Sequence, residues 1–116
     1  MKLNEDKVPC NLKEAITFLK ESITNSELDA IKASAFINNG FHFTLGMHIR
    51  NAWSLWEKDT KLVQWFFKTY GVDFADDISK IILDSFFRDV RGEPRRDKKL
   101  AKQGKEHWKE MSQREA

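Results

Sequence analysis

The side chains best suited to chemistry in this 116-residue chain are concentrated in residues 41–56, FHFTLGMHIRNAWSLW. The stretch contains four aromatic residues, two histidines, an arginine and an asparagine. The guanidinium of Arg50 can bind a carboxylate or a phosphate through two parallel hydrogen bonds. An indole ring such as that of Trp53 can form the wall of a ligand pocket. Two hypotheses follow for the stretch: a core helix that carries a few polar residues, and a binding site.

A second group of polar residues can meet the first if two predicted helices pack together. Asp76 and Asp77 begin a predicted helix that, like the one containing Arg50, has one apolar stripe, so we expect Arg50 to contact one of the two carboxylates. This contact would be either a structural ion pair or the rim of a pocket for a polar or anionic ligand. In the structural interpretation, the histidine and the asparagine are caps or buried hydrogen-bonding groups. The candidate ligand-binding residues are His42, Arg50, Asn51, Trp53, Asp76 and Asp77.

The sequence gives little support for a metal or catalytic site. His42 and His48 are six residues apart, on different faces of a helix, and no His-x-x-x-His, Glu-x-x-His or Cys pair occurs. Cys10 is the only cysteine, which excludes an intramolecular disulfide and a Cys-based zinc site. There is no nucleophile-elbow sequence and no phosphate-binding glycine loop. We therefore predict no metal, no cofactor and no catalytic residue, although a Ser-His-Asp set can be assembled on paper from Ser79, Ser85, His42 and Asp84.

Basic residues are concentrated near the C-terminus. Residues 94–116 contain 8 Lys or Arg and 4 Asp or Glu, a net charge of +4, whereas residues 1–93 contain 12 and 14, a net charge of −2. Such a segment could follow a phosphate backbone with its lysines and stack an indole ring on a base. It could equally be a solvated helix whose opposite charges pair with one another. The candidate nucleic-acid-binding residues are Arg95, Arg96, Lys98, Lys99, Lys102, Lys105 and Trp108.

Apolar residues recur at helical spacing in five segments before this tail. The helix in the opening stretch has its core stripe at Leu45, Ile49, Trp53 and Trp56. Gly46 costs that helix about 1 kcal/mol relative to alanine, which indicates that another backbone or a ligand comes close. Asn38 to Gly40 predict a helix stop, with a possible short extended piece at 40–44. The predicted helices are near 12–24, 27–37, 44–56, 61–70 and 75–91.

These patterns predict an all-α fold with one compact domain. Glycine and proline are scarce, at five and two residues, which argues against a turn-rich β protein. We expect a helical domain of about five helices at residues 1–93 and a basic helical or partly disordered extension at 94–116 that packs weakly on it. No apolar run suits a secretory signal or a membrane span, so we expect a cytoplasmic protein without a membrane partner. Thirteen Phe and Trp residues could leave an exposed apolar patch, which makes a homo-oligomer an option.

The opening stretch resembles a motif of a small, functionally uncharacterised bacterial domain family. In that motif His-Phe, Leu-Gly-Met, Ile-Arg-Asn, Trp and Leu-Trp recur in the order found at residues 42–56. The segment at residues 76–83, DDISKIIL, is similar to the family's Asp-Asp-Met-Ser-x-Ile-Ile-Leu block. The sequence departs from the family pattern in placing Phe-Ala where a His-Pro pair is usual, and Thr44 and Ser54 where glycines are common. The resemblance covers roughly residues 12–93, and it implies a fold rather than an activity.

The functional prediction is a non-catalytic binding protein of bacterial or phage type. Its ligand, a polar or anionic small molecule or an unknown protein partner, would bind around His42, Arg50, Asn51 and Trp53. The first alternative is association with nucleic acid through the basic extension. The second alternative is a small hydrolase-like enzyme, which depends on histidines and aspartates converging in space.

Overall fold

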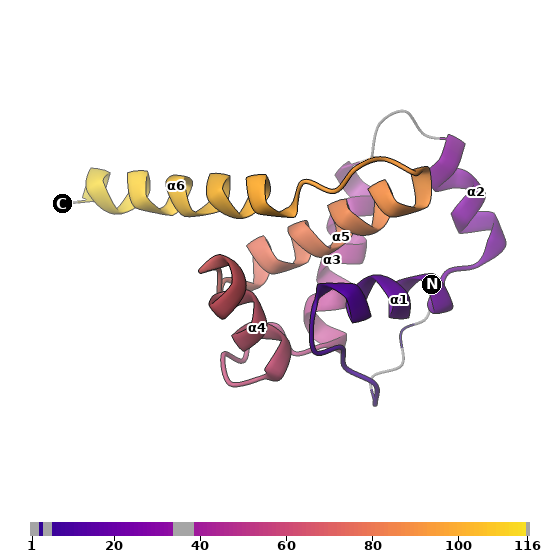
Figure 1. The fold of residues 1–116 in the computed structure, drawn as a ribbon, viewed down its shortest axis with the longest axis horizontal. Helices are drawn as coiled ribbons and strands as arrows, with labels where there is room; N and C mark the ends of the chain where they lie inside the picture. Colours follow the sequence, from indigo (N-terminus) through magenta and orange to yellow (C-terminus); the bar gives the residue numbers. More distant parts are fainter. Residues whose placement is uncertain (1–2, 4–5, 34–38, 116) are drawn as a thin grey trace.

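Six α-helices account for most of the described chain, and no strand occurs in the part that the structure describes (Figure 1). The structure is a computed structural model, and it describes all residues except 1–2, 4–5, 34–38 and 116; the side chains of 39–43 and 111–115 are also left undescribed. The all-α prediction is therefore confirmed for the described residues. The helices are α1 (Leu12–Ser22), α2 (Asn25–Ala33), α3 (Asn39–Ala52), α4 (Lys61–Tyr70), α5 (Ala75–Arg91) and α6 (Asp97–Glu115).

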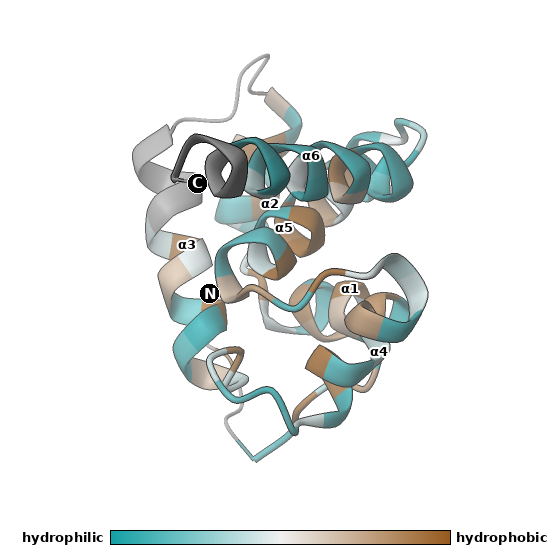
Figure 2. Ribbon diagram, turned by 90° about the vertical axis from the view of Figure 1, so that its left-hand side faces the viewer, coloured by the Kyte–Doolittle hydropathy of each residue, from teal (hydrophilic) through white to brown (hydrophobic). Residues whose placement is uncertain are grey.

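Helix α5 is the centre of the fold, and each of the other helices packs against it (Figure 1). Its middle is buried on every side, from Ile78 to Phe87 with the exception of exposed Lys80. A helix that is apolar nearly all round is one that its neighbours enclose. Figure 2, coloured by hydropathy, shows a mostly hydrophilic α6 lying alongside α5. The position of α5 decides which polar side chains of α3 and α6 can meet.

The ends of several helices follow the local sequence. Asn11 caps α1 by accepting a hydrogen bond from the Glu14 backbone N–H at 2.9 Å, while the Glu14 side chain accepts one from the Cys10 backbone N–H at 2.8 Å. Gly71 and Gly92 end α4 and α5 with φ of 73° and 75°, the left-handed conformation that glycine adopts without strain. The predicted bounds of α4 and α5 are confirmed.

The predicted bounds of the third helix are wrong at both ends. Helix α3 begins at Asn39, so Asn39 and Gly40 start a helix rather than stop one, and residues 40–44 are helical rather than extended. The helix ends at Ala52, and the following turn passes through Ser54 at φ 52°. The turn breaks the helical phase, which buries Leu55 and leaves Trp56 59% exposed, so Trp56 does not belong to the core stripe.

The basic extension forms one helix, α6, that contacts both α5 and α4 and then runs past the body towards the C-terminus (Figure 1). Asp97, Leu100 and Ala101 in its first turns are buried. The start of the extension is therefore packed into the body, although we expected weak packing. Within the described residues, no helix has the length and apolar character needed to cross a bilayer.

Candidate functional site at the α3 and α5 seam

Arg50 lies at the seam between α3 and α5, as predicted, and it meets the first turn of α5. Its Nη1 donates a hydrogen bond to Ser79 Oγ at 3.0 Å and lies 3.6 Å from Asp76 Oδ1. Ser79 Oγ in turn donates to the Asp76 carbonyl oxygen at 3.0 Å. The two charged groups differ in environment, because the Arg50 side chain is 11% exposed and that of Asp76 is 74% exposed. The guanidinium of Arg50 is thus largely buried, and the carboxylate of Asp76 is exposed to solvent.

Gly46 makes room for this arginine. A Cβ at that position would lie 3.0 Å from Arg50 Nη1 and 3.8 Å from Leu83 Cδ1. A close approach does occur at Gly46, but the closest group is the side chain of Arg50 one turn later in the same helix, not the other backbone or the ligand that we predicted. Replacing the glycine would push the guanidinium away from Ser79.

The outer side of α3 next to Arg50 carries exposed apolar groups. Trp56 Nε1 donates to Asn51 Oδ1 at 3.4 Å, and the Arg50 guanidinium carbon lies 5.7 Å from the centre of the Trp56 ring. Met47 is exposed one helical turn before Asn51. We call this surface the α3 face; its residues are Met47, Arg50, Asn51, Trp56 and Asp76.

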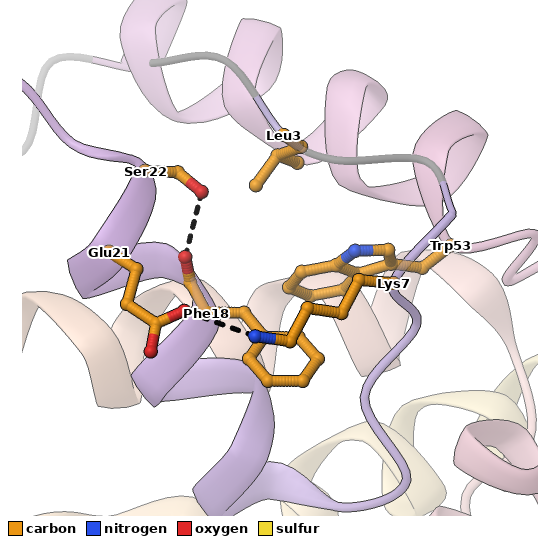
Figure 3. Close-up of a pocket in the computed structure, with 6 residues that line it drawn as sticks. All are labelled: Leu3, Lys7, Phe18, Glu21, Ser22 and Trp53. Carbon is orange, nitrogen blue, oxygen red and sulfur yellow. Dashed lines mark hydrogen bonds and ion pairs between the residues drawn. The ribbon is translucent and has the colours of Figure 1, made fainter.

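The structure separates two of the predicted ligand-binding residues from the others. Trp53 is 1% exposed and points towards α1, where it lines a hollow of about 220 Å³ with Phe18, and Lys7 lies 4.5 Å above the Phe18 ring (Figure 3). Asp77 faces α6 and accepts a hydrogen bond from Trp108 Nε1 at 2.7 Å. His42 belongs to α3, but its side chain lies outside the described residues. The site that forms therefore joins Arg50, Asn51 and Asp76, with Trp56 in the place predicted for Trp53.

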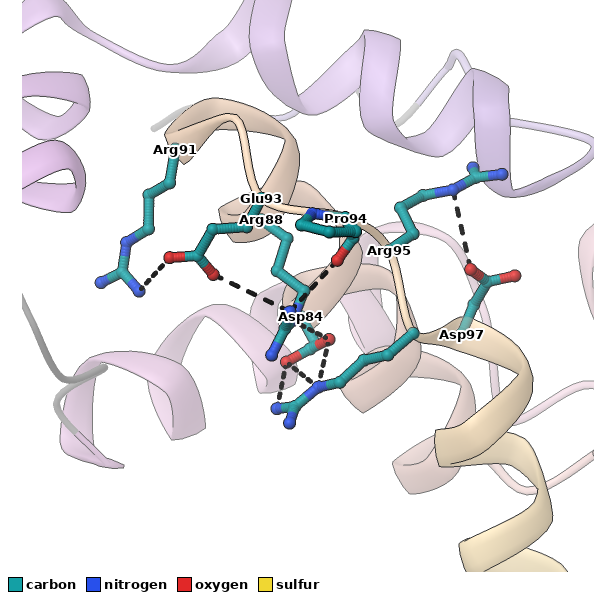
Figure 4. Close-up of polar contacts among 8 residues, drawn as sticks. Asp84, Arg88, Arg91, Glu93, Pro94, Arg95 and Asp97 are labelled. Carbon is teal, nitrogen blue, oxygen red and sulfur yellow. Dashed lines mark hydrogen bonds and ion pairs between the residues drawn. The ribbon is translucent and has the colours of Figure 1, made fainter.

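A second polar cluster joins α5 to α6. Arg96 Nη2 donates to Asp84 Oδ1 at 2.7 Å and Arg96 Nε to Asp84 Oδ2 at 3.1 Å, a two-point pair that raises the pKa of the guanidinium. Arg88 lies 3.3 Å from the same carboxylate and donates to the Pro94 carbonyl oxygen at 3.1 Å, which fixes the connection between the helices (Figure 4). The sequence signal for this contact was a single carboxylate, Asp84, in the apolar run IILDSFF, because a charged residue at a buried position needs a partner.

Tyr70 of α4 makes a second polar contact with the start of α6. Its hydroxyl donates to Asp97 Oδ2 at 2.5 Å. Burial, together with the hydrogen bond to the Asp97 carboxylate and its charge, raises the pKa of Tyr70 well above its ordinary value. The protonated phenol is therefore part of the α4 to α6 contact.

The predicted nucleic-acid residues divide into two groups. Arg95 pairs with Asp97 at 3.6 Å, while Arg96 and Trp108 bind aspartates of α5, so these three are held by the body or by α6 itself. The lysines of α6 are exposed, and four of them recur at i, i+4, i+7 and i+11 along one side of the helix. We call this set, which excludes Lys99, the lysine stripe; its members are Lys98, Lys102, Lys105 and Lys109.

Two of the residues considered for hydrolysis have other contacts, and a third is buried. Ser79 is hydrogen-bonded to Arg50, Asp84 is held by Arg88 and Arg96, and Ser85 is fully buried. Among the residues that the structure describes, no group of three or more His, Cys, Asp or Glu side chains is placed to hold a metal ion.

The family of the chain follows from a match over α1 to α5. A model of the family described as a domain of unknown function, DUF6794, matches residues 8–90. The chain belongs to this family. The DUF6794 region contains the Arg50, Ser79 and Asp76 contact, and it ends before the lysine stripe. The prediction of a functionally uncharacterised domain family is confirmed. Neither a curated protein nor a solved structure is similar enough to be matched.

Proposed function

We propose that the chain is a non-catalytic, cytoplasmic binding protein and that the α3 face holds a protein partner. The observation that carries the proposal is Trp56, which is 59% exposed yet held at both its nitrogen and its ring by Asn51 and Arg50. Trp and Arg are the residues most enriched at the energetic centres of interfaces. An exposed side chain that is already oriented loses less entropy on binding than a free one.

The charges of the α3 face favour a protein over a small anion. The guanidinium of Arg50 is mostly covered and already faces Ser79 and Asp76. The exposed charge at the rim is the Asp76 carboxylate, which would repel an anionic ligand. A partner with an apolar patch for Met47 and Trp56 and a basic residue for Asp76 complements all three groups.

Photocrosslinking in cells that produce the protein tests this proposal. A photoreactive phenylalanine analogue is placed at Trp56 and, as the matched control, at Phe67, which is 57% exposed on α4. We expect a discrete adduct from position 56 that is absent from position 67 and is lost when Asp76→Lys is added. An adduct of twice the chain mass would identify the partner as a second copy. If position 56 gives only the adducts of position 67, the α3 face has no partner.

A second candidate function is nucleic-acid binding through the lysine stripe. Its four amines are exposed, and within the described part of the chain none has an ion pair or a hydrogen bond to another side chain. At a rise of about 1.5 Å per residue the stripe is about 16 Å long, and proteins bind phosphate backbones through such rows of cations.

Salt titration of oligonucleotide binding tests the second candidate. We expect the affinity for a labelled oligonucleotide to fall steeply with salt, and more gently for the Lys102→Gln, Lys105→Gln double variant. Lys13→Gln removes an exposed lysine of α1 and serves as the control. Binding that does not depend on salt, or no binding at low salt, would remove nucleic acid from consideration.

A further inference from the structure

We infer that the nucleic acid held by the lysine stripe is single-stranded and that its bases stack on exposed rings beside the stripe. This inference rests on the second candidate function proposed above and names its substrate class. The rings are Phe67 of α4, Phe74 at the start of α5 and Trp108 of α6, which together we call the aromatic platform.

The platform combines two exposed rings, Phe67 and Phe74, with the half-buried ring of Trp108. Phe74 is 44% exposed and lies face to face with Trp108, with ring centres 4.4 Å apart and planes inclined by 20°. The hydrogen bond from Trp108 Nε1 to Asp77 fixes the Trp108 ring of this stack. Phe67 is 57% exposed on the neighbouring helix. Large apolar rings left in water next to one another commonly mark a binding surface.

Lysines alternate with these rings along one continuous surface. Lys105 of the stripe lines a hollow of about 150 Å³ together with Phe74, Trp108 and Asp77. A second hollow, of about 410 Å³, is lined by Phe67, Lys58 and Lys68. Asp73 borders both hollows, so they are contiguous, and the Lys58 ammonium lies 4.9 Å above the Phe74 ring. Cations that alternate with aromatic rings suit a chain of phosphates that carries flat bases.

The acidic residues of this region lie either at the platform, where each has a partner, or on the far side of α6 from Trp108. Asp73 is paired with Lys58 at 3.0 Å, and Asp77 accepts the Trp108 hydrogen bond. Glu106 and Glu110 are each two residues from Trp108, which places them on the opposite side of α6. At the platform, Lys58 and Lys105 therefore stand beside Asp73 and Asp77, and the excess of positive charge lies along the lysine stripe.

A single strand fits this surface better than a duplex does. In a duplex the bases stack on one another, so only the lysines would be used and the rings would stay in water. The stripe, about 16 Å long, spans roughly five nucleotides at the ~3.4 Å spacing of stacked bases.

Fluorescence anisotropy with the full chain separates the two parts of the inference. The probes are labelled oligothymidine and the same strand paired with oligoadenosine. For four lysines we expect a slope of log affinity against log salt of about −3 on the single strand, and about half of that for the Lys102→Gln, Lys105→Gln variant. Phe67→Ser and Phe74→Ser should each weaken single-strand binding by about fivefold to a hundredfold and leave the slope unchanged. Val8→Ser removes an exposed apolar side chain outside both proposed binding surfaces and should change neither quantity.

Each outcome decides between the alternatives. Equal affinity for duplex and single strand, with no effect of the ring variants, would overturn the stacking inference and leave nucleic-acid binding in place. No binding of either probe at low salt would overturn both. Displacement of oligothymidine by polyglutamate of equal charge, with the same loss in the ring variants, would show that the surface takes an acidic polypeptide and would also overturn the inference. Unchanged circular dichroism of each variant confirms that the fold is intact.

Discussion

Helix α3 and the residue just before α6 each place an arginine against an aspartate of α5, but the two pairs are built in opposite ways. At the α3 seam the arginine is covered and the aspartate is in water, with exposures of 11% for Arg50 and 74% for Asp76. We call the polar contact between the body and the start of α6 the α6 joint. There the aspartate is covered and the arginine is exposed, at 7% for Asp84 and 44% for Arg96. The covered partner of each pair is the one that cannot recover hydration when the contact is lost.

The surroundings of the two pairs differ as well. Helix α3 packs on α5 through buried apolar residues such as Leu45 and Ile49, and its ion pair lies at the rim. Helix α6 contributes few buried apolar residues, chiefly Leu100 and Ala101, and depends more on polar contacts with Asp84 and Tyr70. Apolar packing therefore dominates the first interface and directed hydrogen bonds the second, which gives different responses to mutation.

Removal of residues 94–116 should have the largest effect. It would leave the buried Asp84 without Arg96, Tyr70 without Asp97, and the Phe74 ring without its stacking partner. We expect the melting temperature to fall by more than about 10 °C, which corresponds to a loss of a few kcal/mol in a domain of this size. Thermal melts followed by circular dichroism measure it. A fall of less than about 5 °C would mean that the body is independent of α6 and that the polar joint contributes little.

Ile49→Ala should cost about 2–5 kcal/mol, because the side chain is fully buried between α3 and α5 and leaves a cavity. Leu100→Ala is the matched variant at the other interface. Leu100 lies at the edge of the core, so we expect a loss of about 1–2 kcal/mol. Urea denaturation gives both values. If the loss at Leu100 equals that at Ile49, α6 is held by apolar packing after all and the contrast between the interfaces disappears.

The sequence predicted the apolar interface better than the polar one. Periodicity predicted α4 and α5 and the Leu45 and Ile49 stripe, because spacing along one helix decides which residues share a face. The same spacing predicted that Arg50 meets one of the two adjacent carboxylates; Asp76 contacts α3, and Asp77 contacts α6. Contacts between helices at the rim of an apolar stripe could therefore be predicted from the sequence.

The polar contacts of α6 were not predictable in this way. Asp84 and Arg96 are 12 residues apart, Tyr70 and Asp97 27, and Asp77 and Trp108 31. Which of these groups meet depends on the rotation and register of one helix against another, and periodicity within a helix does not contain that information.

The prediction that Trp56 belongs to the core stripe was wrong because of one residue in the chain just before it. The helical spacing was extended through Ser54, whose φ of 52° breaks the phase. The sequence offered one signal for the break, since glycine is common at that position in the resembling family and glycine adopts positive φ readily.

The two aspartates provide a direct comparison of the pairs. Asp84→Asn removes the covered carboxylate charge that holds Arg88 and Arg96, and we expect a loss of about 2–3 kcal/mol in the free energy of unfolding. Asp76→Asn changes an exposed partner and leaves the Arg50 to Ser79 hydrogen bond in place, so we expect less than about 0.5 kcal/mol. Chemical denaturation of both variants and of the wild type measures the difference. Equal losses would show that the burial of the carboxylate does not set the strength of these pairs.

At neutral pH we expect Tyr70→Phe to change the free energy of unfolding least of these variants. The contribution of Tyr70 becomes visible when the pH is raised. In the unfolded chain a tyrosine ionises near its ordinary pKa of 10.0, and in the folded protein burial and Asp97 raise the pKa of Tyr70 above that value. The folded state therefore holds a proton that the unfolded state releases. The stabilisation is fully present below pH 10 and is lost as the pH rises above it. We expect the free energy of unfolding of the wild type to decline above pH 10 more steeply than that of Tyr70→Phe.

The single tyrosine makes this test specific to the α6 joint, because the tyrosinate absorbance of the folded chain reports Tyr70 alone. Lysines also titrate in this range, but Tyr70→Phe retains all of them and so serves as the control for their effect. In the chain without residues 94–116 the phenol loses Asp97, and its ionisation should move back towards the ordinary value. A tyrosinate transition near pH 10 in the intact chain would contradict the hydrogen bond, and with it one of the polar contacts that distinguish the α6 joint from the α3 seam.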